Sequence, residues 1–267
     1  MFLNILLLSI WKKFKIYFSY RFFVVLNIIT GILQVIWLYY LSRFVHVNFG
    51  GYSDYFSYAF IGILSDVVIQ NSIYGFRNVL RQEQVEGTLE MVMASPTPIE
   101  IFALGSAFSE IVKGLLIVFI MFLTGLFMGA NIVLNLQTII SLLIFLPFMI
   151  TAFLGFGFAA SGVIMVTKKG DPVLFTYSWL NRLLGNMYFP ARILPPFVNF
   201  LRYILPLSFA LNGIRAILLK GHFILEKDVA INLAILIIFT AVTLPAGLLL
   251  FKKGVKRAKK EGTLHLF

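Results

Sequence analysis

The chain has 267 residues, of which 60% are hydrophobic and 12% are charged, and its mean hydropathy is +0.94. This balance excludes a soluble globular domain and predicts an all-α polytopic membrane protein. The formal net charge of +11 does not indicate a nucleic-acid partner, because most lysines and arginines flank apolar runs, where membrane topology and anionic lipid headgroups account for them.

Residues 1–21 predict a helix that lies in the headgroup layer of a membrane. Apolar side chains share one face of this helix and lysines and serines share another: Leu7, Trp11, Phe14 and Phe18 against Ser9, Lys12, Lys15 and Ser19. An extension of the first membrane span fits the pattern nearly as well. The apolar run precedes its lysines instead of following them, so we do not expect a cleavable signal peptide.

Two apolar segments, 22–42 and 55–76, each have about the 20 residues that a membrane span requires. The polar residues 77–97 then interrupt the membrane-like sequence. We expect them to form a loop outside the membrane that contains a short helix, because Leu89, Val92 and Met93 would form one apolar ridge.

The same loop carries three glutamates, Glu83, Glu86 and Glu90, and a glycine, Gly87, which we expect to loosen the incoming helix. A polar loop of this kind favours a docking site for a partner. Judged by spacing alone, a solvated loop with no partner is about as good an interpretation.

Further spans are predicted at 98–130, 138–167 and 172–189, and the last at 229–251. The charged break Lys168-Lys169-Gly170-Asp171-Pro172 separates the second of these from the third. The segment 190–228 is rich in proline and too interrupted for an ordinary span. We expect a re-entrant helical hairpin there, because a full crossing would make seven spans and place the basic tail, 252–267, on the wrong side of the membrane.

Orientation follows from the distribution of basic residues. Fourteen of the 22 lysines and arginines fall on one side of the six-span arrangement, six of them in the tail 252–267. Cytoplasmic loops are enriched in lysine and arginine, so this side is expected to be the cytosol, with both termini cytoplasmic.

Four ionisable residues fall inside predicted spans, where charges are costly and often functional: Asp66, Glu110, Lys113 and Arg182. Glu110 and Lys113 are three residues apart on one helix, so we expect them to form an ion pair. Asp66 and Arg182 are expected to face a central pathway or a dimer seam, and Glu110 is a further pathway candidate. The chain has no cysteine and three widely spaced histidines, so no metal site is expected.

Two strings carry a family resemblance. The first, EGTLEMVMASPTP at 86–98, resembles the ExGTLExxxxxP-type loop of ABC-2 type transporter permeases. The second, at 188–220, resembles the family's other signature, an aromatic-Pro pair, a Leu-Pro, a Pro-Leu-Ser and an arginine: Phe189-Pro190, Leu194-Pro195, Pro206-Leu207-Ser208 and Arg215. The resemblance extends over essentially the whole chain and is greater to the drug-export and nodulation-export branch than to the O-antigen branch.

The resemblance implies a permease subunit of an ATP-driven exporter in the cell membrane. Two copies, or this chain and a homologous permease, would form the substrate pathway and couple to separate ATP-binding cassette subunits through the loop 83–95. The implied coupling residues are Glu83, Glu86, Gly87, Thr88, Leu89, Glu90, Val92 and Met93, and the implied re-entrant gate contains Phe189, Pro190, Pro195, Pro206 and Arg215. The chain lacks a GxxxxGK[ST] loop, so it is not expected to be an enzyme or to hold a cofactor, and ATP and Mg would be bound by the partner.

Two other functions are compatible with the composition. A proton- or ion-coupled secondary transporter would use Asp66 and Glu110 as titrating carboxylates, although no inverted repeat supports it. A membrane-embedded enzyme of lipid metabolism would need a cluster of acid-base or metal-binding residues, which the sequence does not display.

Overall fold

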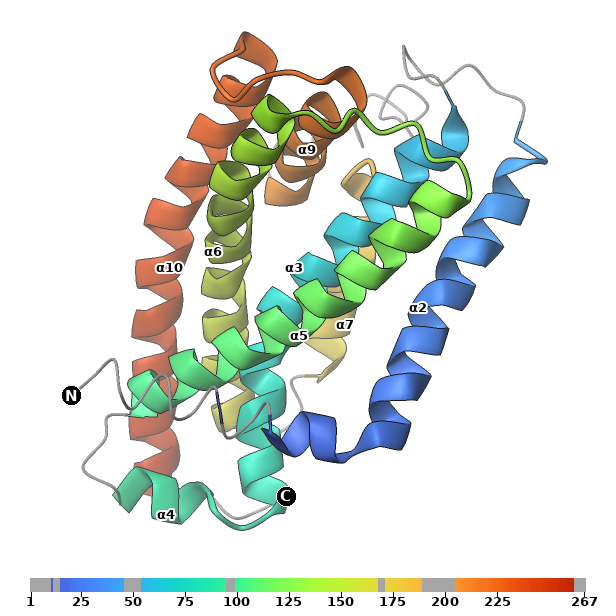
Figure 1. Cartoon of the computed structure of the whole chain (residues 1–267). Helices are drawn as coiled ribbons and strands as arrows, with labels where there is room; N and C mark the ends of the chain where they lie inside the picture. The colour runs from blue at the N-terminus through green and yellow to red at the C-terminus, as the bar shows by residue number, and fades with distance from the viewer. Residues whose placement is uncertain are drawn as a thin grey trace.

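In the computed structural model, the residues described are 11, 15–45, 54–94, 99–167, 171–188 and 205–261. The predicted all-α fold is confirmed over these ranges, which contain eight full helices and no strand. The helices are α2 (Arg21–Ser42), α3 (Tyr55–Val85), α4 (Leu89–Ala94), α5 (Ile99–Phe127), α6 (Leu136–Thr167), α7 (Asp171–Leu184), α9 (Pro206–Lys220) and α10 (Lys227–Glu261). Figure 1 shows the long helices running between two ends, with α4 at one and the start of α10 at the other. We call these the α4 end and the α9 end.

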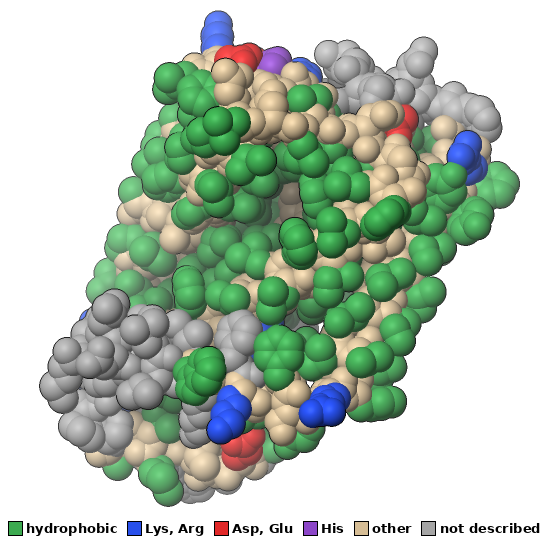
Figure 2. All heavy atoms as spheres, in the orientation of Figure 1, with side chains coloured by type: hydrophobic (Ala, Val, Ile, Leu, Met, Phe, Trp, Pro, Cys, Tyr) green, Lys and Arg blue, Asp and Glu red, His purple; other side chains and the backbone are tan. Residues whose placement is uncertain are grey.

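Five helices, α2, α3, α5, α6 and α10, are long and apolar enough to cross a membrane. The 22 residues of α2 span about 33 Å at 1.5 Å per residue, which matches the hydrocarbon core. Figure 2 shows charged side chains at both ends of the molecule and a mainly hydrophobic band between them.

Several helix ends differ from the sequence expectation. α3 continues nine residues past 76 to Val85, so the first part of the polar loop is helical. α10 likewise continues through the basic tail to Glu261. Apolar runs locate the part of a helix inside the membrane, but backbone hydrogen bonds let the helix continue into water, so hydropathy does not locate its end.

The fifth predicted span, 172–189, is shorter than expected. α7 has 14 residues, about 21 Å, and ends at Leu184, where Gly185 and Asn186 form a turn. Asn186 adopts the left-handed backbone conformation, with φ 64°. The predicted re-entrant segment 190–228 contains α9, while its residues 190–204 lie outside the described ranges. Of the predicted interfacial helix 1–21, residues 15–19 are helical and precede α2 (Figure 1).

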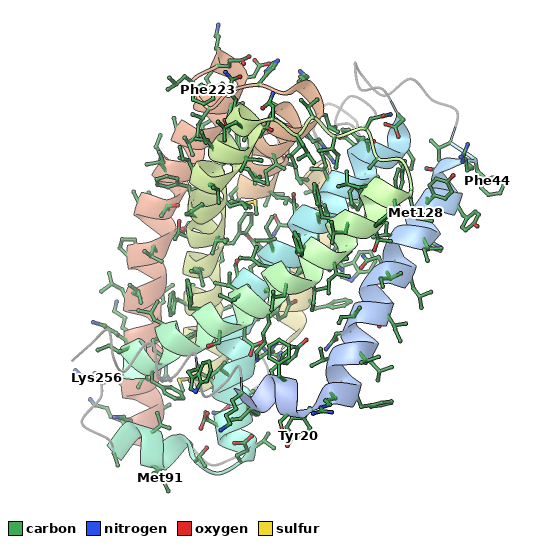
Figure 3. All side chains as sticks on the ribbon, viewed as in Figure 1. Tyr20, Phe44, Met91, Met128, Phe223 and Lys256 are labelled. Carbon is green, nitrogen blue, oxygen red and sulfur yellow. The ribbon has the colours of Figure 1, made fainter. Side chains whose placement is uncertain are left out.

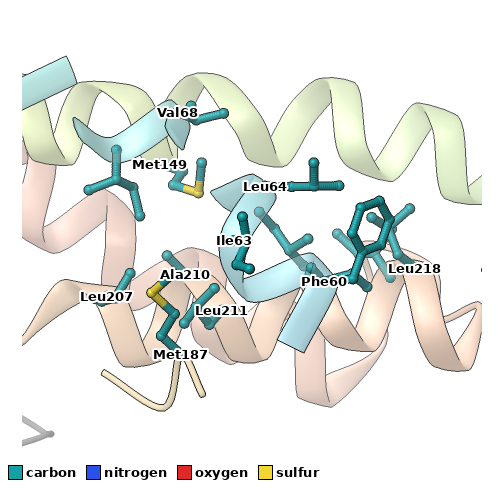
Figure 4. Packing of buried hydrophobic residues seen from close by; sticks show 14 of the residues in the cluster. Phe60, Ile63, Leu64, Val68, Met149, Met187, Leu207, Ala210, Leu211 and Leu218 are labelled. Atoms are coloured by element: carbon teal, nitrogen blue, oxygen red, sulfur yellow. The ribbon is translucent and has the colours of Figure 1, made fainter. Parts of the chain in front are cut away.

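α3 forms the centre of the bundle. It packs against α5, α6, α9 and α2. In the most apolar 18-residue stretch of α3, 78% of the residues are buried, compared with 11–33% in the corresponding stretches of the other four spans. Its buried side chains include Phe60, Ile63 and Leu64, which pack toward Met149 of α6 and Leu211 of α9 (Figure 4). The core is therefore built around one helix that reaches from the α9 end to the turn before α4.

α6 and α10 make the closest helix contact in the bundle. Gly155 and Gly162 of α6 meet Gly247 and Gly254 of α10, and on each helix the two glycines are seven positions apart in the sequence. A Cβ atom added at Gly247 would lie 2.1 Å from the carbonyl oxygen of Gly155. Small residues allow backbones to approach this closely, which stabilises helix association inside a bilayer.

Replacing Gly247 with alanine is therefore expected to push α10 away from α6 and to lower the free energy of unfolding by about 1–3 kcal/mol. The thermal midpoint of the detergent-solubilised protein measures this. The matched control is Gly31→Ala on α2, where the nearest atom to the new methyl group would be Met121 Cγ at 3.1 Å, in a flexible side chain and not in the backbone. Equal midpoints for the two variants would contradict the close contact.

Candidate functional site

A row of polar side chains connects α3 to α7 inside the membrane band. Asp66 Oδ2 accepts a hydrogen bond from Arg182 Nε at 2.9 Å and forms an ion pair with Arg182 Nη2 at 2.9 Å, and Asp66 Oδ1 accepts a hydrogen bond from Gln70 Nε2 at 2.9 Å. The Ser178 hydroxyl lies 3.2 Å from Gln70 Oε1 and 3.0 Å from the Tyr74 hydroxyl. We call these five residues the α3–α7 polar ladder.

The ladder brings together two residues that the sequence placed separately in the membrane. Asp66 is 6% exposed, whereas one-third of the Arg182 side chain is exposed. Pairing with a cation and an amide reduces the cost of a buried carboxylate. The spacing of Asp66, Gln70 and Tyr74, four residues apart, places them on one face of α3 and was the available sequence signal for this row.

The predicted pair of Glu110 and Lys113 on α5 is confirmed, with 2.6 Å between Glu110 Oε1 and Lys113 Nζ. Lys113 Nζ also lies 4.9 Å from the centre of the Tyr17 ring. Burial raises the pKa of the Tyr17 hydroxyl above its ordinary value, despite a hydrogen bond with Asn27 that lowers it. The phenol is therefore neutral at pH 7 and offers its ring to the lysine.

This pair lines a cavity of about 900 Å³ at the α4 end of the bundle. Its walls come from residues 16–27, the end of α3, the α3–α4 turn, α4 and the first part of α5. Figure 3 shows Tyr20 and Met91 at this end. Three glutamates, Glu83, Glu86 and Glu110, and one cation, Lys113, are among the lining residues, so the acidic side chains of the cavity outnumber its basic ones.

The turn between α3 and α4 is fixed by hydrogen bonds. Gly87 has φ 68°, and the amides of Gly87 and Thr88 donate to the carbonyls of Gln84 (3.1 Å) and Glu83 (2.9 Å). This is the Schellman arrangement that ends a helix at a left-handed glycine. The Thr88 hydroxyl also donates to Glu83 Oε2 at 2.6 Å. The expectation that Gly87 loosens the helix is wrong, because Gly87 ends α3 and sets the direction of α4.

Replacing Gly87 with alanine places a Cβ in the left-handed region, at a cost of about 1–2 kcal/mol. We expect faster hydrogen exchange at the amides of residues 87 and 88, whose bonds belong to the turn. Gly129→Ala is the matched control, because Gly129 has φ 86° and, like Gly87, open space around a Cβ. If Gly129→Ala changed exchange at residues 87 and 88 equally, the assignment of the turn would fail.

The other predicted loop residues are placed as follows. Glu86 is exposed, and its carboxylate accepts a hydrogen bond from Gln82 at 2.8 Å. Val92 is half-buried and Met91 is 75% exposed, and both line the cavity. The side chains of Leu89, Glu90 and Met93 lie outside the described part of the structure.

At the α9 end, Arg215 is fully buried and binds three backbone carbonyls. Its Nη1 donates to Asn186 O (2.8 Å), Nη2 to Met187 O (2.9 Å) and Tyr58 O (3.1 Å), and Nε to Tyr58 O (3.2 Å). The guanidinium carbon lies 3.5 Å from the centre of the Tyr58 ring, and the Tyr58 hydroxyl donates to Asn186 O. Arg215 thus joins α9, the start of α3 and the turn after α7.

Of the predicted gate residues, Arg215 and Pro206 are described, and Pro206 begins α9 at a position where proline is favoured. Phe189, Pro190 and Pro195 lie outside the described residues. The partners of Arg215 were not predicted, because backbone carbonyls leave no side-chain pattern in the sequence. Within the described ranges, no group of three or more His, Asp or Glu side chains is placed to hold a metal ion.

Comparison with known proteins gives one family match. The sequence model of the family described as ABC-2 type transporter matches residues 5–219. The matched region contains the α3–α4 turn, the α3–α7 polar ladder and Arg215. No curated protein matches the chain.

Proposed function

The chain belongs to the ABC-2 type transporter family, the permease components of ABC transporters, and on that premise we propose that it forms the substrate pathway of an ATP-driven exporter. The observation that carries this proposal is the continuity of α3. One helix of 31 residues reaches from the Arg215 contacts, through the α3–α7 polar ladder, to the fixed turn that precedes α4. A rigid helix with contacts at both ends is suited to transmit a movement across the membrane.

In this proposal α4 docks on a separate ATP-binding cassette subunit. The short helix lies at one end of the bundle (Figure 1), and a hydrogen-bonded turn joins it directly to α3. Leu89, Val92 and Met93 would supply apolar contact, while Glu86 and Glu90 would face basic groups of the ATPase, where complementary charge fixes the docking register. The partner would bind ATP and Mg.

The basic residues support a cytosolic position for the α4 end. The lysines and arginines on the last turns of α10 are exposed, and Lys15 and Arg21 lie near the start of the described chain. The positive-inside rule places such residues in the cytoplasm. We therefore propose that both termini are cytoplasmic and that Arg215 and α9 lie toward the outer face, where they form part of the gate.

A second copy of the chain, or a homologous permease, would cover α7 in the complete transporter. α7 exposes Phe175, Trp179 and Leu183, and one-third of the Arg182 side chain is exposed beside them. A partly exposed guanidinium at this depth is costly in lipid. A neighbouring permease subunit or a water-filled pathway would reduce that cost, and we propose on this ground that the α3–α7 polar ladder lies at the dimer seam.

The ion-coupled alternative finds less support. It needs carboxylates that gain and lose protons, but Asp66 is bonded to Arg182 and Glu110 to Lys113. An ion pair of this kind lowers the cost of holding a carboxylate inside a membrane, so each pair has a structural explanation that needs no proton transport.

The test is purification of the tagged chain from its native membrane, with identification of stoichiometric partners and assay of vanadate-sensitive ATPase activity. We expect a subunit with a Walker motif at one-to-one stoichiometry. The double variant Leu89→Asp, Val92→Asp is expected to lose this subunit, because two charges would enter the apolar contact. Leu225→Asp is the control, since Leu225 is 79% exposed at the opposite end. A chain that purifies alone and without ATPase activity would refute the proposal and favour the ion-coupled transporter.

A further inference from the structure

A second pocket, of about 410 Å³, lies between α5 and α6. Its floor is formed by α3, with Ser65 among the residues, and its inner end by Ile214 and Leu218 of α9. Figure 2 shows a hollow with hydrophobic side chains around it on the face of the molecule where Figure 1 places α5 and α6. We call this the α5–α6 pocket.

The pocket is closed toward the α9 end and open at the side. The segment between α5 and α6 crosses over its end, where the amide of Val133 donates to the carbonyl of Leu218 at 2.8 Å. Two of the lining residues, Phe119 and Ile139, are 59% and 47% exposed. A molecule that enters between these side chains comes from the hydrocarbon region of the membrane and not from water.

The chemistry of the lining excludes water as the occupant. Of its sixteen residues, two are polar, Ser65 and Thr138, and the Thr138 hydroxyl already donates to Asn135 O and accepts from Asn135 N. A stable buried water needs two to four polar partners. An empty apolar void, in contrast, leaves its lining without dispersion contacts on one side. Hydrocarbon is the occupant that satisfies both conditions.

The shape favours a single extended chain. The lining residues of α6 extend from Thr138 to Met149, which is about 16 Å along the helix. The volume lies within the range of about 300–1,000 Å³ that is typical of small-molecule sites. An apolar pocket of this length and volume that opens into a bilayer matches one acyl chain of a lipid, with the headgroup outside the pocket.

We propose that the α5–α6 pocket binds one acyl chain of a bilayer phospholipid as a resident part of the folded protein. The chain lies between α5, which follows α4 in the sequence, and Ile214 and Leu218, which flank Arg215 on α9. Its presence keeps α5 apart from α6. The bound lipid therefore contacts both the helix that leads from α4 and the helix that carries the Arg215 contacts.

Photo-crosslinking in nanodiscs tests the proposal on the full-length protein. The disc contains unlabelled phosphatidylcholine and a tracer phosphatidylcholine with a diazirine near the end of one acyl chain, and the labelled residues are mapped by mass spectrometry. We expect labelling to be concentrated on pocket residues such as Val118 and Leu142. Labelling that is no greater there than on Leu143, which is 66% exposed on the lipid side of α6, would overturn the proposal.

A pair of variants adds a second measurement. Val118→Trp fills the pocket, and native mass spectrometry after delipidation is expected to show loss of the one lipid that wild type retains. Leu143→Trp adds an indole on the exposed side and is expected to retain that lipid. Retention of the lipid by a folded Val118→Trp protein, or absence of a retained lipid in wild type, would refute a resident chain. The wild-type labelling map remains decisive if Val118→Trp fails to fold.

Discussion

Replacing Arg215 with methionine is expected to lower the free energy of unfolding by about 2–4 kcal/mol and to abolish ATPase coupling in the assembled transporter. The substitution keeps apolar volume but removes the donors to Tyr58 O, Asn186 O and Met187 O. Each buried acceptor that loses a hydrogen bond costs about 1–3 kcal/mol. The turn after α7 would also lose its connection to α3 and α9.

Two further variants separate the contributions at this site. Arg215→Lys keeps the charge, but an ammonium group lacks the planar fork that reaches carbonyls on two sides, so an intermediate loss is expected. Tyr58→Phe removes the hydroxyl that donates to Asn186 O and keeps the ring, so its effect should stay within about 1 kcal/mol. Thermal unfolding of the purified chain measures all three. If Arg215→Met were as stable as wild type, the three carbonyls would have to be satisfied by other donors.

The two ends of α3 explain why contacts at Arg215 can matter for an event at α4. At one end the Tyr58 carbonyl and ring hold the guanidinium, and at the other Gly87 and Thr88 fix the turn into α4. The polar ladder lies between them and joins α3 to α7. No flexible loop interrupts α3 along this length. We therefore expect a shift of α4 to move the ladder and the Arg215 contacts together.

The sequence predicted contacts that are local and missed those that are not. Glu110 and Lys113 were paired correctly because three residues on a helix place them on adjacent turns. Asp66 and Arg182 are 116 residues apart, and the sequence predicted that each faces a central pathway or a dimer seam without predicting that they pair. Their pairing depends on the packing of α7 against α3, which hydropathy does not encode.

The same distinction applies to helix lengths. Apolar runs located the spans, since burial in hydrocarbon is what they report. They did not predict two helix ends. α3 continues to Val85, where the left-handed Gly87 follows, and α7 ends at Leu184, before the end of the predicted span 172–189. Both helices end beside a residue with a left-handed backbone, Gly87 and Asn186. The glycine in the string EGT, 86–88, was the one local sequence signal for such an end.

Removing either partner of the Asp66–Arg182 pair is expected to have the second large effect. Asp66→Leu leaves the Arg182 guanidinium without its carboxylate, which costs about 3–5 kcal/mol for a fully buried pair and less here because Arg182 is one-third exposed. Asp66→Glu retains the charge and should keep most of the stability. The thermal midpoint and the vanadate-sensitive ATPase activity of the complex are measured for each variant.

The double variant Asp66→Leu, Arg182→Leu separates a structural pair from a functional one. Replacing both charges with apolar groups removes the unpaired ion, so the thermal midpoint should return close to the wild-type value. If the α3–α7 polar ladder lines the pathway or the dimer seam, the double variant will be stable but will still lack coupled ATPase activity. Recovery of both stability and activity would show that the pair serves packing alone, and the pathway would then have to lie elsewhere in the bundle.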